Sequence, residues 1–195
     1  MANPIIRGVS SLTRFSGRDR RRQFWPYAGV VIALSYGLMM VFGVAAMAPM
    51  ITAMTDYAAA NPEHATVTTG PGHYEVSIDA AAPGAPSPDF LPFLTVVGAV
   101  ALIAVVLLSA AVSRRLHDTG RTALWGLAPL PFLTFGLVVT PMMMGNFMGE
   151  AEPNFALFGL LFLNNVVYMA ALVGLIAVLC LATKPGPNRY GEEPA

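Results

Sequence analysis

Two adjacent side chains in the middle of the chain, His117 and Asp118, are of the types that exchange protons in acid–base catalysis. Such a pair alone does not make a catalytic site, because catalysis also needs a nucleophile or a metal that further groups position. No Cys/His/carboxylate cluster with metal-ligand spacing accompanies the pair. We therefore expect no catalytic residue, no metal site and no cofactor. We predict instead that Asp118 forms a salt bridge with an arginine while His117 caps a turn.

Arginine and aromatic residues recur in three polar motifs, at positions 15–25, 114–121 and 185–191. A guanidinium group near an anionic membrane surface gains about 1 kcal/mol of attraction, and tryptophan rings favour the headgroup region. These motifs predict a binding site for anionic lipid or a protein partner, with a plain topology anchor as the alternative interpretation. The candidate residues are Arg18, Arg21, Arg22, Trp25, Arg114, Arg115, His117, Asp118, Asn188 and Tyr190. No glycine-rich phosphate loop or nucleic-acid module occurs in the sequence, so we expect no nucleic-acid partner.

The polar motifs flank four long apolar stretches, which must position them. The stretches cover residues 27–50, 90–112, 124–144 and 155–181, and none contains Lys, Arg, Asp, Glu or His. Each reaches the roughly 20 residues that a helix needs to cross a bilayer. Only 11% of all residues are charged, about half the fraction of a soluble domain. The sequence therefore predicts an all-α integral membrane protein, with four transmembrane helices in a single membrane domain of residues 1–195.

The charged residues are segregated between the connections. All 11 basic residues lie in the juxtamembrane segment 1–25, in the link between the second and third stretches, or after the fourth stretch. The other two connections carry acids instead, namely Asp56, Glu63, Glu75, Asp79, Asp89, Glu150 and Glu152. By the positive-inside rule, this distribution predicts that both termini and the middle link lie in the cytoplasm.

The connection at residues 51–89 is the longest one outside the apolar stretches, and the charge pattern makes it extracytoplasmic. Its Ala, Pro and Gly residues are typical of a flexible loop. Within it, residues 66–69 and 74–78 alternate polar and apolar side chains around Gly70-Pro71-Gly72, which predicts a short β-hairpin. A two-stranded hairpin is marginally stable in water unless it packs on something else.

Small residues in the first stretch and prolines in the third predict how the helices pack. Gly29, Ala33 and Gly37 form a stripe at every fourth position, which lets helix backbones approach closely. We expect the stripe to pack inside the chain, with a second copy as the alternative. Pro129 and Pro131 each remove a backbone donor, so a bend is expected near the cytoplasmic third of the third helix.

Two adjacent amides lie well inside the fourth stretch, at Asn164 and Asn165. Amides in lipid usually hydrogen-bond a neighbouring helix, and we expect that structural role here. Ion-coupled transport generally needs a titratable group within the membrane. The four stretches contain no charged residue or histidine, which counts against active transport.

Taken together, the three motifs resemble the bacterial inner-membrane family catalogued as domain of unknown function 805 (DUF805). Members have Gly-Arg-x-x-Arg-x-x-Phe-Trp before a first span, Arg-Arg-Leu-His-Asp-x-Gly before a later one, and Gly-x-Asn-x-Tyr-Gly near the end. The matching residues here are Gly17, Arg18, Arg21, Phe24, Trp25, Arg114 to Asp118, Gly120, Gly186, Asn188, Tyr190 and Gly191. Thr122-Ala123-Leu124-Trp125 departs from the family's usual Ser-Gly-Trp-Trp, and the 51–89 connection is longer than usual. The resemblance implies a bacterial inner-membrane location and supplies no activity.

Our leading hypothesis is therefore a non-enzymatic, multi-pass inner-membrane protein whose cytoplasmic arginine and aromatic face binds membrane lipids of anionic type or a protein partner. The alternative is a small transporter or channel, as a homodimer if two copies line the path. It is motivated by the proline bend and the Asn164/Asn165 pair. An enzyme acting on lipid is a third hypothesis and rests on His117 and Asp118 alone.

Overall fold

The structure is a computed structural model that describes residues 3–148 and 154–194. Its elements, in chain order, are α1 (Pro4–Ser10), α2 (Arg21–Ala60), β1 (Ala65–Gly70), β2 (His73–Ile78), α3 (Leu91–Asp118), the 3₁₀ helix η1 (Ala123–Leu127), α4 (Leu130–Met148) and α5 (Phe155–Leu179). Glu150 and Glu152, two of the acids used to predict the orientation, lie outside the described residues.

Four helical stretches within the described residues are long and apolar enough to cross a membrane: α2, α3, η1 with α4, and α5. Large apolar side chains point outward along them, among them Leu34, Met40 and Phe155, which are 62%, 68% and 72% exposed. Soluble proteins rarely expose contiguous apolar surface of this kind. The outward faces of the bundle are thus suited to lipid rather than to water.

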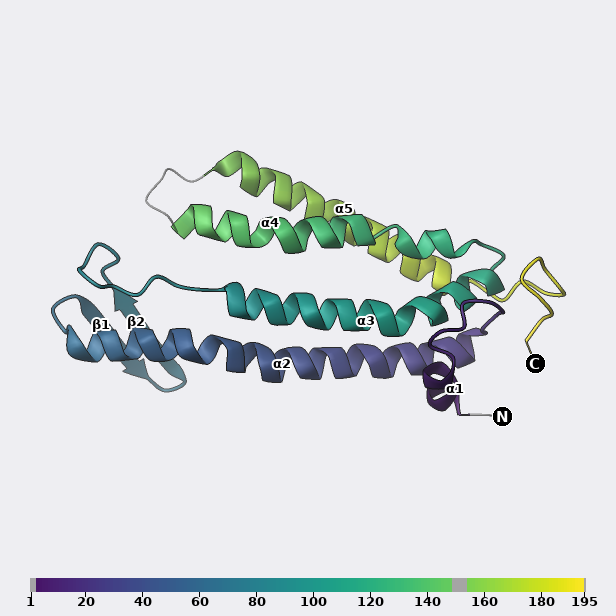
Figure 1. The fold of residues 1–195 in the computed structure, drawn as a ribbon, viewed down its shortest axis with the longest axis horizontal. Helices are drawn as coiled ribbons and strands as arrows, with labels where there is room; N and C mark the ends of the chain where they lie inside the picture. The colour runs from purple at the N-terminus through teal and green to yellow at the C-terminus, as the bar shows by residue number, and fades with distance from the viewer. Residues whose placement is uncertain (1–2, 149–153, 195) are drawn as a thin grey trace.

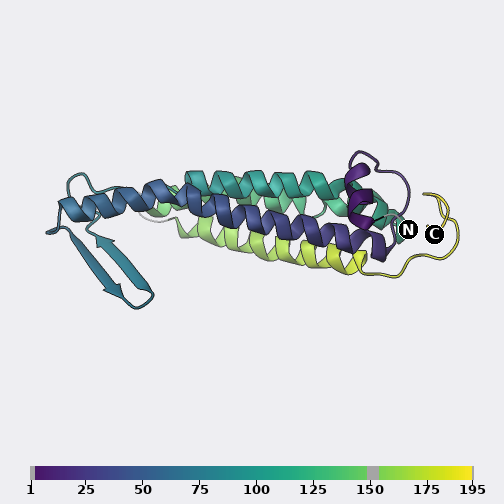
Figure 2. The same ribbon diagram turned by 90° about the horizontal axis from the view of Figure 1, so that it is seen from below.

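The helices form two pairs that lie roughly parallel to one long axis. Figure 1 shows α2 beside α3 and α4 beside α5, with the N- and C-terminal segments at the same end of the bundle. We call this the terminal end. Figure 2 shows that α2 continues past the other helices at the opposite end, where the hairpin lies. The short helix α1 lies across the bundle axis in both views.

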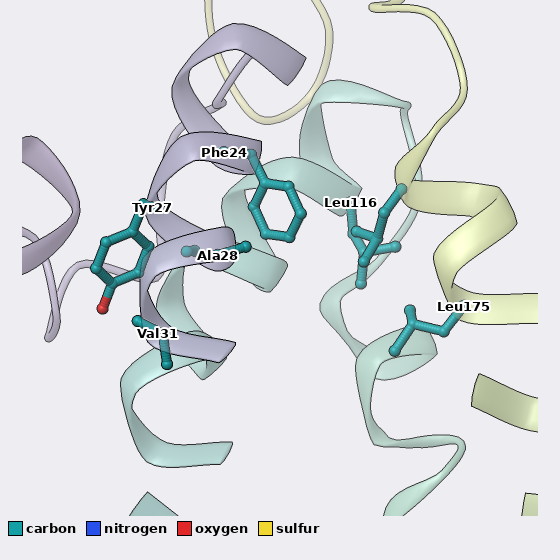
Figure 3. Packing of buried hydrophobic residues seen from close by; sticks show 8 residues of the cluster. Phe24, Tyr27, Ala28, Val31, Leu116 and Leu175 are labelled. Carbon is teal, nitrogen blue, oxygen red and sulfur yellow. The ribbon is translucent and has the colours of Figure 1, made fainter. Parts of the chain in front are cut away.

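The tightly packed apolar core lies near the terminal end. Aromatic and aliphatic side chains of α2 meet α3 and α5 there (Figure 3), and the buried members are Phe24, Tyr27, Ala28, Val31, Ala111, Leu116, Leu175 and Leu179. The hydroxyl of Tyr27 donates a hydrogen bond of 2.8 Å to the backbone carbonyl of Leu107. The core therefore fixes the ends of three helices relative to one another.

α2 is longer than its apolar stretch. It has 40 residues and is therefore roughly 60 Å long, about twice the thickness of a hydrocarbon core. The expectation that residues 51–60 belong to a flexible loop is wrong, because they continue α2 to Ala60. Ala-rich sequence without Gly favours a helix there, and the hydroxyl of Tyr57 donates to the Pro83 carbonyl at 3.2 Å.

The predicted hairpin is confirmed. β1 and β2 pair antiparallel in a register that runs from Ala65 opposite Ile78 to Gly70 opposite His73. The backbone N–H of Asp79 donates to the His64 carbonyl at 2.9 Å and closes its open end. Beside it, the extended end of α2 supplies the surface that an isolated hairpin lacks.

The predicted proline bend is present as a break between two helices. η1 ends at Leu127, and α4 begins at Leu130. Proline lacks an N–H and its ring clashes with the preceding turn, so a continuous helix through Pro129 and Pro131 is unfavourable. The Pro129 carbonyl accepts from the N–H of Leu133 and thus belongs to the first turn of α4.

The prediction that the small-residue stripe packs inside the chain is wrong. A Cβ atom added at Gly29 or Gly37 would meet no described atom within 4 Å, and Ala33 is exposed. α2 instead uses another face, where a Cβ at Gly43 would lie 3.2 Å from the Phe93 ring. Spacing of small residues reveals a smooth helix face, but the larger aromatic contacts of Tyr27 and Phe24 decide which face is buried.

The amides of the fourth stretch have different environments. Asn164 is buried, and its Nδ2 donates to the Phe132 carbonyl of α4 at 3.0 Å, as predicted for an interhelical amide. Asn165 is exposed and donates to the Leu161 carbonyl of its own helix at 3.0 Å. The predicted role therefore holds for one of the two residues.

Candidate functional site

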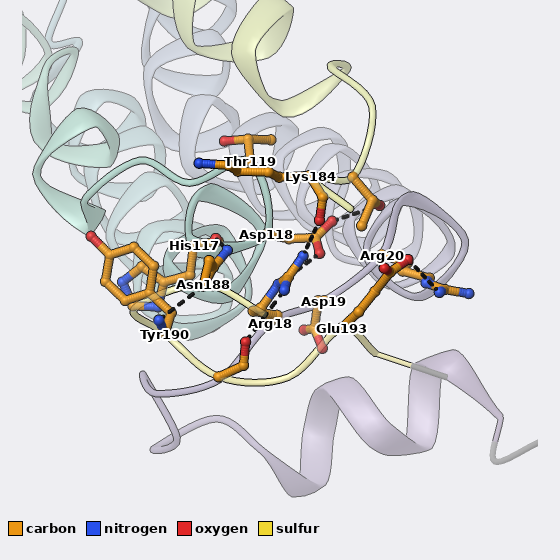
Figure 4. Close-up of polar contacts among 12 residues, drawn as sticks. Arg18, Asp19, Arg20, His117, Asp118, Thr119, Lys184, Asn188, Tyr190 and Glu193 are labelled. Atoms are coloured by element: carbon orange, nitrogen blue, oxygen red, sulfur yellow. Dashed lines mark hydrogen bonds and ion pairs between the residues drawn. The ribbon is translucent and has the colours of Figure 1, made fainter. Parts of the chain in front are cut away.

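The structure gathers all ten candidate site residues at the terminal end (Figure 1), but not on one accessible face. Figure 4 shows those that surround Asp118, namely Arg18, His117, Asn188 and Tyr190. Four of them are buried, with exposures from 0% to 4%: Arg18, Arg114, Arg115 and Asp118. Arg21 and Arg22 are exposed, whereas Trp25, His117, Asn188 and Tyr190 are half-buried. The predicted site thus separates into an internal network and an outer rim.

Asp118 stands at the centre of the internal network. Its Oδ1 accepts a hydrogen bond from Nε of Arg18 at 3.3 Å. Its Oδ2 accepts from Nη1 of Arg115 and, at 2.8 Å, from the hydroxyl of Thr183. The predicted salt bridge between Asp118 and an arginine is confirmed, and it is doubled. Burying a carboxylate is costly, and the two guanidinium groups offset this cost because they neutralise the charge of Asp118 locally.

A second buried carboxylate, Asp19, holds the segment before α2 against α3. Its two oxygens accept from Nε of Arg114 and from Nη2 of Arg7, each at 2.7 Å. Nη1 of Arg114 also donates to the Ser11 carbonyl at 2.8 Å. Asp19 was missing from the predicted site residues, although its position between arginines in the first motif could have marked it.

The remaining donors of the buried arginines bind backbone carbonyls that would otherwise lack partners. Nε of Arg115 donates to the Leu179 carbonyl at 2.9 Å and its Nη2 to the Leu181 carbonyl, just where α5 ends. The last carbonyls of a helix have no intrahelical donor and carry partial negative charge, so a guanidinium satisfies both needs. Nη1 of Arg18 donates to the Gly186 carbonyl at 2.7 Å and extends the network to the tail.

The His117 ring makes both a hydrogen bond and a stacking contact, with segments outside α3. Its Nδ1 lies 3.2 Å from the Gly17 carbonyl, which requires the proton on Nδ1 because a carbonyl only accepts. The ring stacks on Tyr190 with a centroid separation of 3.8 Å and an interplanar angle of 8°. Nδ2 of Asn188 donates to the His117 carbonyl at 3.1 Å. Both predicted tail residues therefore bind the end of α3.

Two glycines permit this arrangement. Gly120 has φ +80° and ends α3, with the Gly120 N–H bonded to the His117 carbonyl and the Arg121 N–H to the Leu116 carbonyl. This pairing is the Schellman motif, which favours glycine. At Gly8 a Cβ atom would lie 2.3 Å from the ring of Tyr27, so the close packing of α1 on α2 requires a residue without a side chain at this position. Nothing in the sequence pattern marks Gly8.

The polar groups of the internal network are engaged by one another and by the backbone. Every buried side-chain nitrogen and oxygen in the described part of the chain has a hydrogen-bond partner. Among the described residues, no group of three or more His, Cys, Asp or Glu side chains could hold a metal ion. Three buried guanidinium groups face two buried carboxylates. The network therefore carries one positive charge in excess, and it gives the terminal end an attraction for anions.

Four apolar helices suited to a membrane, tied at one end by an arginine–carboxylate network that also binds both terminal segments, define a multi-pass membrane protein. The chain belongs to DUF805, a family of proteins of unknown function, whose sequence model matches residues 12–192 and so includes all three motifs. No curated protein and no solved structure matches the chain.

Proposed function

We propose that this protein is a non-enzymatic component of the bacterial inner membrane whose terminal end faces the cytoplasm and binds anionic phospholipid headgroups. The orientation rests on the positive-inside rule, since all 11 basic residues belong to the terminal end. The bacterial location rests on the resemblance of the motifs. Lipid binding rests on the geometry of the outer rim.

One observation carries the proposal, namely that exposed cations and exposed apolar side chains share the same level of the bundle. Three arginines are exposed around the start of α2: Arg14 in the segment before it, and Arg21 and Arg22 as its first residues. Beside them, α1 lies across the bundle axis and exposes Ile6 by 67% and Val9 by 56%. A helix that lies in the membrane plane buries such side chains at the headgroup boundary, where arginines meet lipid phosphates.

The site is accordingly smaller than the ten residues that the sequence predicts. Arg18, Arg114 and Arg115 use their donors inside the protein, and they contribute by holding the rim and by their excess charge. Arg21 and Arg22 remain as direct ligands. Trp25 lies in the first turns of α2, and its ring meets that of Phe24 edge-on with the ring centroids 5.1 Å apart. A tryptophan ring at this level suits the membrane–water interface.

A protein partner or a second copy at the same rim is the nearest alternative. The transporter alternative has lost part of its motivation, because Asn164 and Asn165 both donate to backbone carbonyls. The enzyme hypothesis has also lost support, because His117 and Asp118 are each engaged by other groups rather than by one another.

Native mass spectrometry of the protein, extracted gently from its own membrane, tests the proposal. We expect bound anionic phospholipid that is lost when Arg14, Arg21 and Arg22 are all changed to Gln. The matched control changes Lys184 and Arg189, two exposed cations of the tail, to Gln and should keep the lipid. Retention of the same lipid by the triple variant, or a protein without lipid, would reduce the rim to a topology anchor. A stoichiometric second protein would favour the partner alternative.

A further inference from the structure

An apolar groove lies between α3, η1 and α5 on the side of the bundle near the terminal end. Its volume is about 390 Å³, within the ~300–1,000 Å³ typical of small-molecule sites. The lining is aliphatic and aromatic except for three hydroxyls, and it includes Leu108, Val112, Leu127, Leu133, Tyr168 and Leu172. The groove is open to its surroundings, because three side chains that line it are exposed by 51% to 68%: Phe15, Leu124 and Leu127.

A second hollow, of about 370 Å³, is lined partly by sequence neighbours of the groove residues and has the opposite character. Four arginines line it: Arg7, Arg14, Arg18 and Arg114. Arg7 and Arg114 pair with Asp19 and Arg18 pairs with Asp118, whereas Arg14 has no ion pair among the described residues. Serine hydroxyls from residues 10, 11 and 16 add hydrogen-bond donors. No carboxylate is part of this lining in the described residues. A concave surface of this composition is complementary to a phosphate.

Residues that are neighbours in the sequence line both hollows in two stretches of chain. Phe15 lines the groove, whereas its neighbours Arg14 and Ser16 line the cationic hollow. In the same way, Ser113 lines the groove and Arg114 lines the hollow. The Ser113 hydroxyl donates to the Phe15 carbonyl at 3.0 Å, so one hydrogen bond marks the boundary. A ligand that fills both hollows must be apolar on one side of this boundary and anionic on the other.

We propose that these neighbouring hollows are the binding site for one anionic phospholipid, with an acyl chain in the groove and the phosphate at Arg14. This inference deepens the proposed function and rests on it. The charge complementarity commits the site to an anionic amphiphile, since an apolar protein segment would leave Arg14, which has no ion pair within the described part of the chain, without a counter-charge. A folded partner needs about 1,000 Å² of contact surface or more, whereas the two hollows together are of ligand size.

The test uses the full-length protein in nanodiscs that contain phosphatidylcholine with a minor fraction of phosphatidylglycerol. One of the two lipids carries a photoactivatable diazirine on its acyl chain, and the adducts are mapped by peptide sequencing. We expect the phosphatidylglycerol probe to concentrate its adducts at Leu108 and Leu172 in the groove. Labelling of Leu102, an outward-facing residue of α3, gives the background level.

Variants that fill the groove make the result specific. Ala104→Phe and Ser109→Phe place a ring in the groove from α3 and should reduce labelling of Leu108 and Leu172 to the Leu102 level. Ala99→Phe, on an exposed position of α3 outside the groove, is the matched control and should leave the labelling unchanged. Arg14→Gln should make the phosphatidylglycerol probe behave like the phosphatidylcholine probe.

The inference is overturned by uniform labelling of lipid-facing residues, by equal groove labelling from both probes, or by labelling that survives both groove-filling variants. Mapping of the wild-type chain decides the matter even where a phenylalanine variant fails to fold. If the groove result fails while arginine-dependent lipid retention persists, the proposed function stands and only this site is wrong. If retention does not depend on the arginines, the proposed function itself fails.

Discussion

Arg18 and Asp118 are separated by 100 residues in the sequence, and in the folded chain Nε of Arg18 lies 3.3 Å from Oδ1 of Asp118, with both side chains almost fully buried. The same guanidinium donates to the carbonyls of Lys184 and Gly186. One side chain before α2 therefore binds the end of α3 and the tail after α5. The terminal end is held together by such contacts, and the following predictions test them.

Asp118→Asn is expected to destabilise the protein strongly. The substitution keeps the shape but removes the charge that neutralises Arg18 and Arg115 in a buried site. Breaking a buried ion pair in this way costs roughly 3–5 kcal/mol. Thermal unfolding of the purified protein in a mild detergent should show a clearly lower midpoint. The control Asp56→Asn removes an exposed carboxylate of α2, and its effect should stay within about 0.5 kcal/mol.

Arg115→Lys is expected to loosen the tail even though the charge is kept. The guanidinium donates to four acceptors, the Asp118 carboxylate and the backbone carbonyls of Leu179, Leu181 and Asp19. A lysine ammonium is a compact point charge and cannot reproduce this planar fork. Trypsin should therefore cleave after Arg189, which Tyr190 follows, several times faster than in the wild-type protein. Arg21→Lys is the matched control, because Arg21 is exposed and contacts a single carbonyl, that of Cys180. Equal cleavage rates in the two variants would contradict the role of Arg115.

Gly8→Ala is expected to release α1 from the bundle. The added methyl group would lie 2.3 Å from the ring of Tyr27, so either α1 or the ring must move. Overpacking of this kind typically costs about 1–3 kcal/mol. We expect faster tryptic cleavage after Arg7 and Arg14 in detergent. Gly29→Ala serves as the control, because its added methyl group meets no described atom within 4 Å. Protection of both sites in the Gly8 variant would show that α1 adapts without detaching.

The contact between Glu193 and the first motif is expected to open in acid. The hydrogen bond from the Gly186 N–H, together with the Arg20 guanidinium, holds the pKa of the Glu193 carboxyl below its ordinary value. A lowered pKa in the folded state means that the contact stabilises the tail at neutral pH. This contribution is lost as the pH falls through the lowered pKa, below about 4.3.

A nitroxide attached after Glu192→Cys, in a Cys180→Ser background, reports this opening by electron paramagnetic resonance. The label should become mobile with a midpoint below the usual range of glutamate. With Glu193→Gln added, the label should be mobile at every pH and the midpoint should vanish. A midpoint that persists in the Gln variant would assign the transition to another carboxyl group.

Some of the fold and site follows from local pattern, and the rest does not. The four apolar stretches and the hairpin are local features, since hydropathy and turn residues determine them within a short window. The buried partner of Asp118 could be predicted as some arginine, but not as Arg18 and Arg115 together. Asp19 and Gly8 escaped prediction because their roles depend on Arg114 and Tyr27, which lie far away in the sequence.

The sequence by itself determined that this chain has four apolar helices, where the third is interrupted by proline, and that all its cations lie before the first apolar stretch, between the second and third, or after the fourth. Composition and spacing suffice for these features because the bilayer requires long apolar helices and proline removes backbone donors. Only the tertiary structure decided which arginines turn inward and which form the exposed rim. That division depends on partners, since a guanidinium is buried where distant carboxylates and helix-end carbonyls satisfy all its donors, and stays exposed where the fold brings none.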